Sequence, residues 1–255
     1  MKVLSIDLDY IFPTLPNNFG FDSECGEYED ILDLVEESDI ITHPVERWEN
    51  INRRSNYRYQ DFVYDADKLK YLKYLYLTAL PKCDNVEFGY EHDNIMYTLK
   101  DCYDIELTNV DTHDDVINTD GGPSREESNY SCDEGNWIGL LSRENRLKSY
   151  QHICGKISEC KQSYLKTVLN CDYEVTVKKP LLTDPKFDYI FVCLSPYNLP
   201  PQFWNIFEKM IHTYEQFYDQ KYDRSALLKK FEIDYRYEFL HQCSNDREQV
   251  PVPWL

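Results

Sequence analysis

Six side chains of the kind that bind metal ions fall in three short patches of this sequence. The patches are VLSIDLDYIF with Asp7 and Asp9, FGYEHDN with His92, and NVDTHDDV with Asp111, His113 and Asp115. Carboxylate and imidazole groups are hard or borderline donors that suit Mn²⁺ or a similar divalent ion. Two such ions held close together make hydroxide available at neutral pH. The pattern therefore predicts a dinuclear metal site of the kind that hydrolases use.

The elements that must position these side chains are β-strands, because each patch closes an apolar run. The runs cover residues 2–6, 85–89 and 102–110, and their composition is typical of buried strands. Ligands and metals collect at the carboxyl ends of strands in α/β sheets. Further strands are expected at 172–178 and 187–194, and helices at 27–37, 65–80, 136–150 and 201–219. We therefore expect an α/β fold with three layers (αβα) and a mostly parallel sheet.

The expected domain organisation is a single domain over residues 1–255, in which 221–255 forms a C-terminal helix and tail. A chain of this length buries roughly 70–75% of the surface that its unfolded form exposes. The loop at 118–135 is rich in turn-forming and acidic residues. Loops of that length inside a compact domain are usually functional.

The spacing within two of the patches predicts how the donors converge. On an extended segment alternate side chains share a face, so Asp111, His113 and Asp115 would point the same way. Asp7 and Asp9 have the same spacing. Two carboxylates on one face repel each other unless a cation or a proton lies between them. The alternative for the D-x-H-x-D pattern is an accidental acidic turn, and His92 alone would more often be structural.

Composition limits the partners and the location of the protein. The formal net charge is −19, which argues against nucleic acid because phosphate binding needs a basic face. A cationic peptide would instead be attracted to this surface, and the alternative is that the acidity serves solubility alone. No apolar run is long enough to span a bilayer, and the chain begins with a strand rather than a signal sequence. Nine cysteines with no CxxC pair are typical of a reduced, cytoplasmic protein. The oligomeric state stays open.

The three patches together resemble the arginase/agmatinase/deacetylase superfamily. In that superfamily a histidine after one strand, a D-x-H-x-D on the next and a D-x-D on a later strand bind two Mn²⁺ ions. The segment GNWIG at 135–139 is similar to the GN-x-x-G of the arginase substrate loop. One departure is that D-x-D opens this chain, which looks like a circular permutation of the same sheet. Within the superfamily the chain looks most like the peptide arginases, which act on ribosomally made precursor peptides.

The resemblance implies two Mn²⁺ ions per chain and a role for each donor. One ion would be surrounded by His92, Asp111, Asp115 and Asp7, and the other by Asp111, His113, Asp7 and Asp9. Asp115 would hold the attacking hydroxide and pass a proton to the leaving amine. Asn136 matches the asparagine of the substrate loop. The arginase histidine two residues further on is replaced here by Ile138, which puts its proton-shuttle role in doubt.

The activity implied by the resemblance is hydrolysis of arginine side chains in a precursor peptide to ornithine and urea. Glu134 is a candidate guanidinium partner, because a carboxylate matches that planar cation bidentately, and a solvated loop acid is its alternative. Ser195 and Tyr197 are weaker substrate-binding candidates. They are placed near the site because their strand should neighbour the strand that carries Asp7.

Two other functions remain open at this point. The D-x-D at the end of a strand also resembles the opening motif of haloacid-dehalogenase-like phosphatases, with Asp7 as the nucleophile and Asp9 as the acid/base. That interpretation leaves His92 and the D-x-H-x-D pattern without a role. The second alternative is a non-catalytic protein whose acidic groups bind basic peptides.

Overall fold

The computed structural model describes residues 1–11, 44, 48, 63–116, 132, 135–154, 165–181, 185–196 and 198–224. Contacts divide the chain into two compact units. The first comprises Met1–Ile11 and Ala66–Ser195, and the second comprises Phe12–Asp65 and Pro196–Leu255. The helix expected at 27–37 and most of the expected C-terminal segment lie outside the described residues. The single-domain interpretation stays a prediction.

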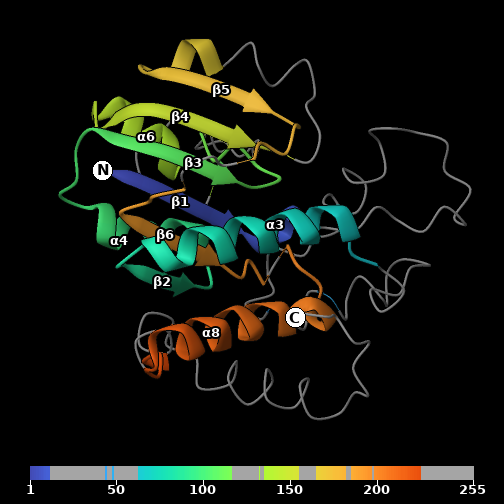
Figure 1. Ribbon diagram of the computed structural model, residues 1–255. Helices are drawn as coiled ribbons and strands as arrows, with labels where there is room; N and C mark the ends of the chain where they lie inside the picture. The colour runs from blue at the N-terminus through green and yellow to red at the C-terminus, as the bar shows by residue number, and fades with distance from the viewer. Residues whose placement is uncertain are drawn as a thin grey trace, which may run out of the picture. The chain divides into compact units, whose positions relative to one another are not determined.

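The first unit is built on a six-stranded parallel sheet with the strand order β2-β6-β1-β3-β4-β5 (Figure 1). The strands are β1 (Lys2–Asp7), β2 (Val86–Gly89), β3 (Ile105–Val110), β4 (Leu147–Ile153), β5 (Asp172–Thr176) and β6 (Tyr189–Cys193). β1 pairs with β3 on one side and β6 on the other, although it opens the chain. The predicted α/β class and parallel sheet are confirmed.

Helices lie on both faces of this sheet, which makes the three predicted layers. In Figure 1, α3 (Ala66–Ala79) passes in front of β1 and β6, and α4 (Ile95–Leu99) and α6 (Trp137–Arg143) lie behind the sheet. The rear core packs side chains of α4 and α6 against β1, β3, β4 and β6. Short 3-10 helices follow three elements: η1 (Leu8–Ile11), η4 (Leu80–Lys82) and η5 (His92–Asn94).

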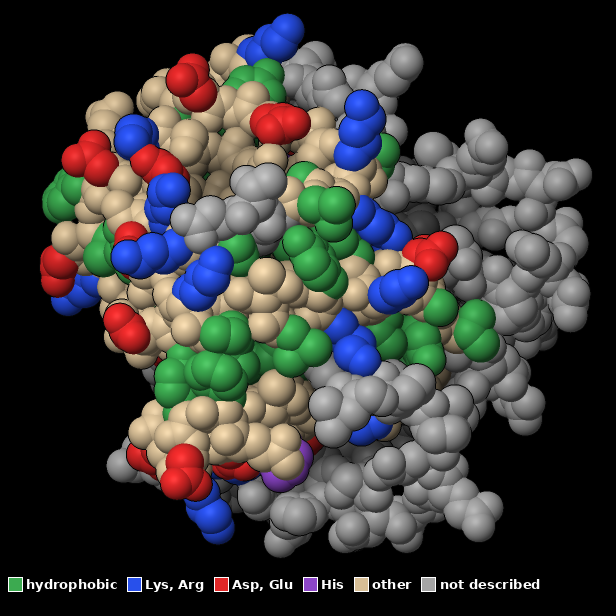
Figure 2. All heavy atoms as spheres, in the orientation of Figure 1, with side chains coloured by type: hydrophobic (Ala, Val, Ile, Leu, Met, Phe, Trp, Pro, Cys, Tyr) green, Lys and Arg blue, Asp and Glu red, His purple; other side chains and the backbone are tan. Residues whose placement is uncertain are grey.

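The front of β3, β4 and β5 differs from the rear because it carries polar side chains. Glu106, Thr108, Gln151 and Glu174 border a groove of about 520 Å³ there. Alternation along β3 puts Glu106 and Thr108 on the face opposite Leu107 and the rear core, and Gln151 and Glu174 lie in register beside Thr108 on β4 and β5. Figure 2 shows basic and acidic side chains interspersed over the described part of this side of the molecule. The net negative charge is therefore not gathered into one patch on that face.

One predicted helix is wrong in its second half. The sequence predicted a helix over 136–150, but α6 ends at Arg143 and β4 begins at Leu147. Asn145 has φ 53°, a left-handed conformation that commonly ends helices and that asparagine tolerates better than most residues. The chain turns there and Leu147, Tyr150 and the residues after them enter the sheet beside β3.

The second unit contributes η6 (Pro201–Phe203) and α8 (Asn205–Tyr218), where a helix was predicted at 201–219. Ile206, Phe207, Met210 and Ile211 are its buried residues, spaced as one face of a helix. No helix among the described residues is both long and apolar enough to cross a bilayer. The cysteines that the structure describes carry free thiols.

Candidate metal centre

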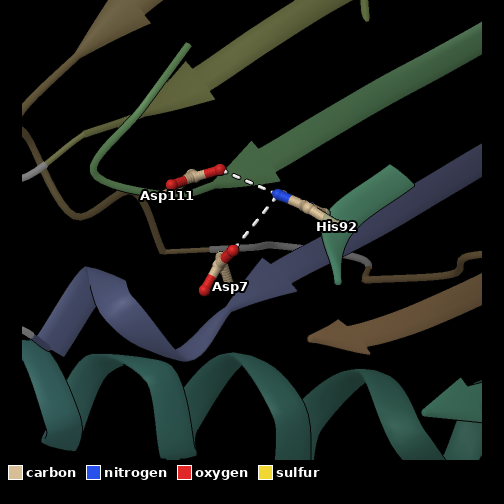
Figure 3. Close-up of side chains that lie close together, drawn as sticks. All are labelled: Asp7, His92 and Asp111. Carbon is tan, nitrogen blue, oxygen red and sulfur yellow. Dashed lines mark ion pairs between the residues drawn. The ribbon is translucent and has the colours of Figure 1, made fainter. Parts of the chain in front are cut away.

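Four of the predicted donors meet at the carboxyl ends of β1 and β3. His92 Nδ1 lies 3.3 Å from Asp7 Oδ2, 3.0 Å from Asp111 Oδ2 and 2.8 Å from Asp115 Oδ2. Figure 3 shows His92, Asp7 and Asp111 pointing toward one another from η5 and from the ends of the two strands. The four side chains are almost completely buried. They form what we call the inner group: Asp7, His92, Asp111 and Asp115.

The other two donors form a second group that shares Asp111 with the first. His113 Nδ1 lies 3.0 Å from Asp9 Oδ2 and 3.7 Å from Asp111 Oδ1. One donor atom from each of these residues falls within 4.8 Å of the others. Asp9 is fully buried, whereas 32% of the His113 side chain is exposed. We call Asp9, Asp111 and His113 the outer group.

The donors converge by a different route from the one that their spacing predicted. Asp9 is not on the strand with Asp7 but in η1, which begins at Leu8. The segment after Val110 is not extended either, because Asp115 has φ 49°. Asp111 and Asp115 consequently face His92, while His113 faces Asp9. A left-handed conformation in a residue other than glycine costs free energy and is often found at functional sites.

Three side chains that are not donors themselves make hydrogen bonds to members of the inner group. Ser5 Oγ lies 2.6 Å from His92 Nε2. The indole N–H of Trp137 donates to Asp115 Oδ2 at 2.8 Å, and the Ser195 hydroxyl donates to Asp7 Oδ2. The sequence analysis did not identify Ser5 or Trp137. A signal for Ser5 was present, since a serine two residues before Asp7 in a buried strand shares its face.

Ser195 therefore lies at the site, as its place beside the Asp7 strand predicted. Its hydroxyl contacts a carboxylate of the inner group, whereas the prediction gave it a role in binding substrate. Like Asp115 it has a left-handed backbone, with φ 47°. Tyr197 and Glu134 lie outside the described residues. Asn136 is fully buried and precedes α6, where its carbonyl accepts from Leu140.

Aromatic rings and two glycines determine how closely the elements around the donor groups pack. The His92 ring lies 5.0 Å from the Trp137 ring and stacks on Phe191 at 6.2 Å. A Cβ on Gly89 would lie 2.5 Å from the Phe191 ring. A Cβ on Gly139 would lie 2.0 Å from the Val116 carbonyl oxygen. Only glycine lets α6 approach closely enough for Ile138 N–H and Gly139 N–H to donate to the Asp115 carbonyl.

The charges of the site are unbalanced within the protein itself. Four carboxylates are buried together with one buried imidazole, His92, and one partly exposed imidazole, His113. Two like charges about 4 Å apart repel by about 4 kcal/mol at an effective dielectric constant of about 20. Whole domains are stable by only about 5–15 kcal/mol. The four carboxylates therefore cannot all be ionised here unless protonated histidines or bound cations balance their charge.

The pKa values show where protons would go in the absence of a cation. Burial, together with the negative charge of Asp111, raises the pKa of Asp7 and Asp9 and brings that of Asp115 to about 8. Burial lowers the pKa of His92, but Asp115 and Asp111 outweigh it and leave that pKa well above its ordinary value. Asp111 is the exception, since contacts with the two histidines outweigh burial and hold its pKa well below the usual range.

The donor atoms themselves fit a metal ion. Among the residues that the structure describes, no hydrogen bond of proper geometry reaches either carboxylate oxygen of Asp9, and His92 Nδ1 makes none despite its three close oxygens. Buried polar atoms without partners are costly, and a cation among them removes that cost. Ions bound at about 2.0–2.2 Å keep neighbouring donors about 3 Å apart, as they are here. The buried aspartate and histidine groups can hold a metal ion.

His152, to which the sequence analysis assigned no role, also lies near the site. Its Nε2 is 3.1 Å from the Asp111 carbonyl oxygen, and its ring stacks on Tyr150. The Tyr150 hydroxyl in turn donates to the Asp114 carbonyl. Both side chains support the backbone of the 111–115 segment.

No protein-family model, curated protein or solved structure matches this chain.

Proposed function

We propose that this protein is a manganese-dependent peptide arginase, which hydrolyses arginine side chains in a peptide to ornithine and urea. The observation that carries the proposal is the sharing of Asp111 between two adjacent donor groups. A pair of groups with a common carboxylate suits two ions, and the mixture of carboxylates and imidazoles suits Mn²⁺. The reaction is inferred from the resemblance of the D-x-D and D-x-H-x-D motifs to those of arginases.

The inner and outer groups would each hold one ion, with Asp111 between them. When bound, such a pair lowers the pKa of water enough to provide hydroxide at neutral pH. Asp115 is the acid that we assign to proton transfer. Its Oδ2 accepts from Trp137, which orients the carboxylate. Asp115 would take a proton from the attacking water and deliver it to the leaving nitrogen, so that the guanidinium carbon departs as urea.

A peptide is the favoured substrate because of the charge of the protein. The net charge of −19 attracts a cationic chain and raises its rate of encounter. Segment 117–134, which follows the D-x-H-x-D motif directly, has five acidic residues and one basic residue. Glu134 in this segment remains our candidate for the guanidinium partner, and Asn136 for a further substrate contact. A cytoplasmic location is part of the same proposal.

Mass spectrometry of an arginine-containing peptide incubated with the protein and Mn²⁺ tests this function. Each converted arginine should lose about 42 mass units, since the metal-activated water replaces the guanidinium group by an amine. Chelated protein should convert none. A peptide unchanged in mass, together with phosphate release from a generic phosphate ester, would instead favour the phosphatase alternative. Binding of the peptide without conversion and without metal would favour a non-catalytic role.

A further inference from the structure

We propose that strand β5 pairs with β5 of a second copy of this chain, so that the protein forms a dimer with one continuous sheet. The strand order ends at β5, which pairs with β4 alone among the strands that the structure describes. Figure 1 shows β5 as the outermost strand on its side of the sheet. An open strand edge is a template for another strand. The pairing does not involve the metal centre and is independent of the proposed function.

Alternate residues of β5 direct their backbone groups toward the open edge. Cys154 N–H donates to the Thr176 carbonyl oxygen at 3.0 Å, so Thr176 faces β4. In a strand the N–H and C=O of one residue point to one side, and those of the next residue point to the other. Tyr173 and Val175 therefore present their N–H and C=O groups at the edge. Val177, the first residue after the strand, continues this row.

This alternation limits how two copies can pair. A two-fold axis normal to the sheet sets the two strands antiparallel, and two-fold dimers are the commonest homo-oligomers. Outward groups meet outward groups when Val175 lies opposite Val175 of the second copy. Tyr173 then lies opposite Val177, and each of these pairs can exchange two hydrogen bonds. A slip of one residue would set outward groups against residues that face β4.

The charged side chains of the segment select this register among those that the backbone allows. With Val175 at the axis, Asp172 lies opposite Lys178 of the second copy, and symmetry repeats the pair. Both side chains are exposed, and neither forms an ion pair with another described residue. Pairing would extend the strand through the bend at Lys178. A register that sets Glu174 opposite Glu174 is disfavoured, because like charges directly opposite each other repel.

Apolar side chains on the rear of the segment favour the same partner. Tyr173 and Val175 pack against the rear core, whereas the side chain of Val177 is 45% exposed. In the paired sheet Val177 would lie beside Tyr173 of the second copy. Pairs of an aromatic and a β-branched side chain across antiparallel strands are favourable. The exposed valine would therefore gain an apolar neighbour.

Sedimentation equilibrium of the full-length protein tests the dimer. At about 0.15 M salt the Debye length of about 8 Å screens the general repulsion between two negative chains, and we expect twice the mass of one chain. Val175→Pro should give a folded monomer by circular dichroism, because proline is tolerated where a strand N–H faces an open edge but cannot donate across it. Wild-type protein that stays monomeric up to its solubility limit, or a dimer unaffected by Val175→Pro, would overturn the pairing.

Charge reversal tests the register. Lys178→Glu should weaken the dimer about tenfold or more, since two pairs of opposite charge become pairs of like charge. Asp172→Lys should do the same, and the double variant Asp172→Lys/Lys178→Glu should restore the dimer. Lys70→Glu is the matched control, because Lys70 is exposed on α3, in front of β1 and β6. A double variant that stays weak would contradict the register. Displacement of the second copy by an arginine-rich peptide would show that the edge binds peptide instead.

Discussion

Asp111 is the residue on which the centre depends most, because it belongs to both donor groups and neighbours both imidazoles. Its replacement leaves each group with too few ligands. The same change also removes part of the negative charge that raises the pKa of His92, to which Asp115 contributes more. The two metal positions should therefore fail together when this one side chain is changed.

Asp111→Asn should abolish metal binding and urea release while the chain still folds. Loss of a side chain that hydrogen-bonds to a metal ligand costs about 10–100-fold in metal affinity. Loss of a ligand that both ions share should exceed that range. Elemental analysis after dialysis measures the metal, and circular dichroism checks the fold. The exposed residue Asp101 provides the control, since Asp101→Asn should keep both ions. Retention of two ions by Asp111→Asn would contradict this role.

The titrating groups of the site predict that metal-free protein loses stability as the pH rises. The pKa values of Asp7, Asp9 and Asp115 are raised in the folded state, so folding favours their protonated forms. That stabilisation is complete below the ordinary aspartate pKa of about 4 and is lost up to about 8 for Asp115. His92, whose pKa is also raised, contributes in the same direction.

Thermal unfolding of chelated protein between about pH 6 and about pH 8 measures this effect, because ordinary carboxylates are already ionised over that range. The unfolding temperature should fall toward higher pH. Protein loaded with Mn²⁺ should show the opposite or no trend, because ligands bind metal in their deprotonated forms. Asp115→Asn should reduce the slope of the chelated protein. Chelated wild-type protein that becomes more stable toward pH 8 would refute the assignment.

At the scale of elements, the close contact between α6 and the 111–116 segment positions Asp115. Gly139→Ala would place a methyl group 2.0 Å from the Val116 carbonyl oxygen. Such overpacking typically costs about 1–3 kcal/mol, and here it also pushes on the segment whose Asp115 carbonyl accepts from the N–H groups of Ile138 and Gly139. We expect lower stability in chemical denaturation and weaker metal binding. Leu140→Ala, a half-buried position on the same helix, should leave metal affinity unchanged.

The strands were predictable because each is a short apolar run that ends at a turn signal or a charged residue. β1, β3 and β6 lie where the sequence placed them. β4 was missed because its apolar residues Leu147, Tyr150 and Ile153 stand three apart, as on one face of a helix. Its boundary is one left-handed residue, Asn145. The resemblance placed the strand before Ser195 beside the strand of Asp7, and β1 does pair with β6. The full order of the strands could not be predicted, since apolar runs do not encode which strand pairs with which.

The candidate site was predictable in its residue types but not in its backbone. All six predicted donors come together, yet alternate spacing on a strand is not the reason. η1 turns Asp9 toward His113, and the left-handed Asp115 turns back toward His92. Contacts between distant segments, such as Trp137 with Asp115 and Ser5 with His92, depend on packing that no local pattern records.

At the scale of the whole molecule, the net charge of −19 should affect substrate encounter rather than chemistry. Salt shortens the Debye length from about 30 Å at about 0.01 M to about 3 Å at about 1 M. The Michaelis constant for an arginine-rich peptide should therefore rise with salt, while kcat changes little. A peptide with one arginine and compensating acids is the control. Equal salt dependence for both peptides would exclude electrostatic attraction as a factor.

The proposed centre requires two cations among six side chains from three separate segments of the chain. Anomalous diffraction at the manganese edge from crystals of the Mn²⁺-loaded protein measures their positions directly. We predict two peaks about 3.5–4 Å apart, as in other two-metal sites, one among Asp7, His92, Asp111 and Asp115, and one among Asp9, Asp111 and His113. A map with no peak at these carboxylates, in crystals whose solution contains Mn²⁺, would contradict the account.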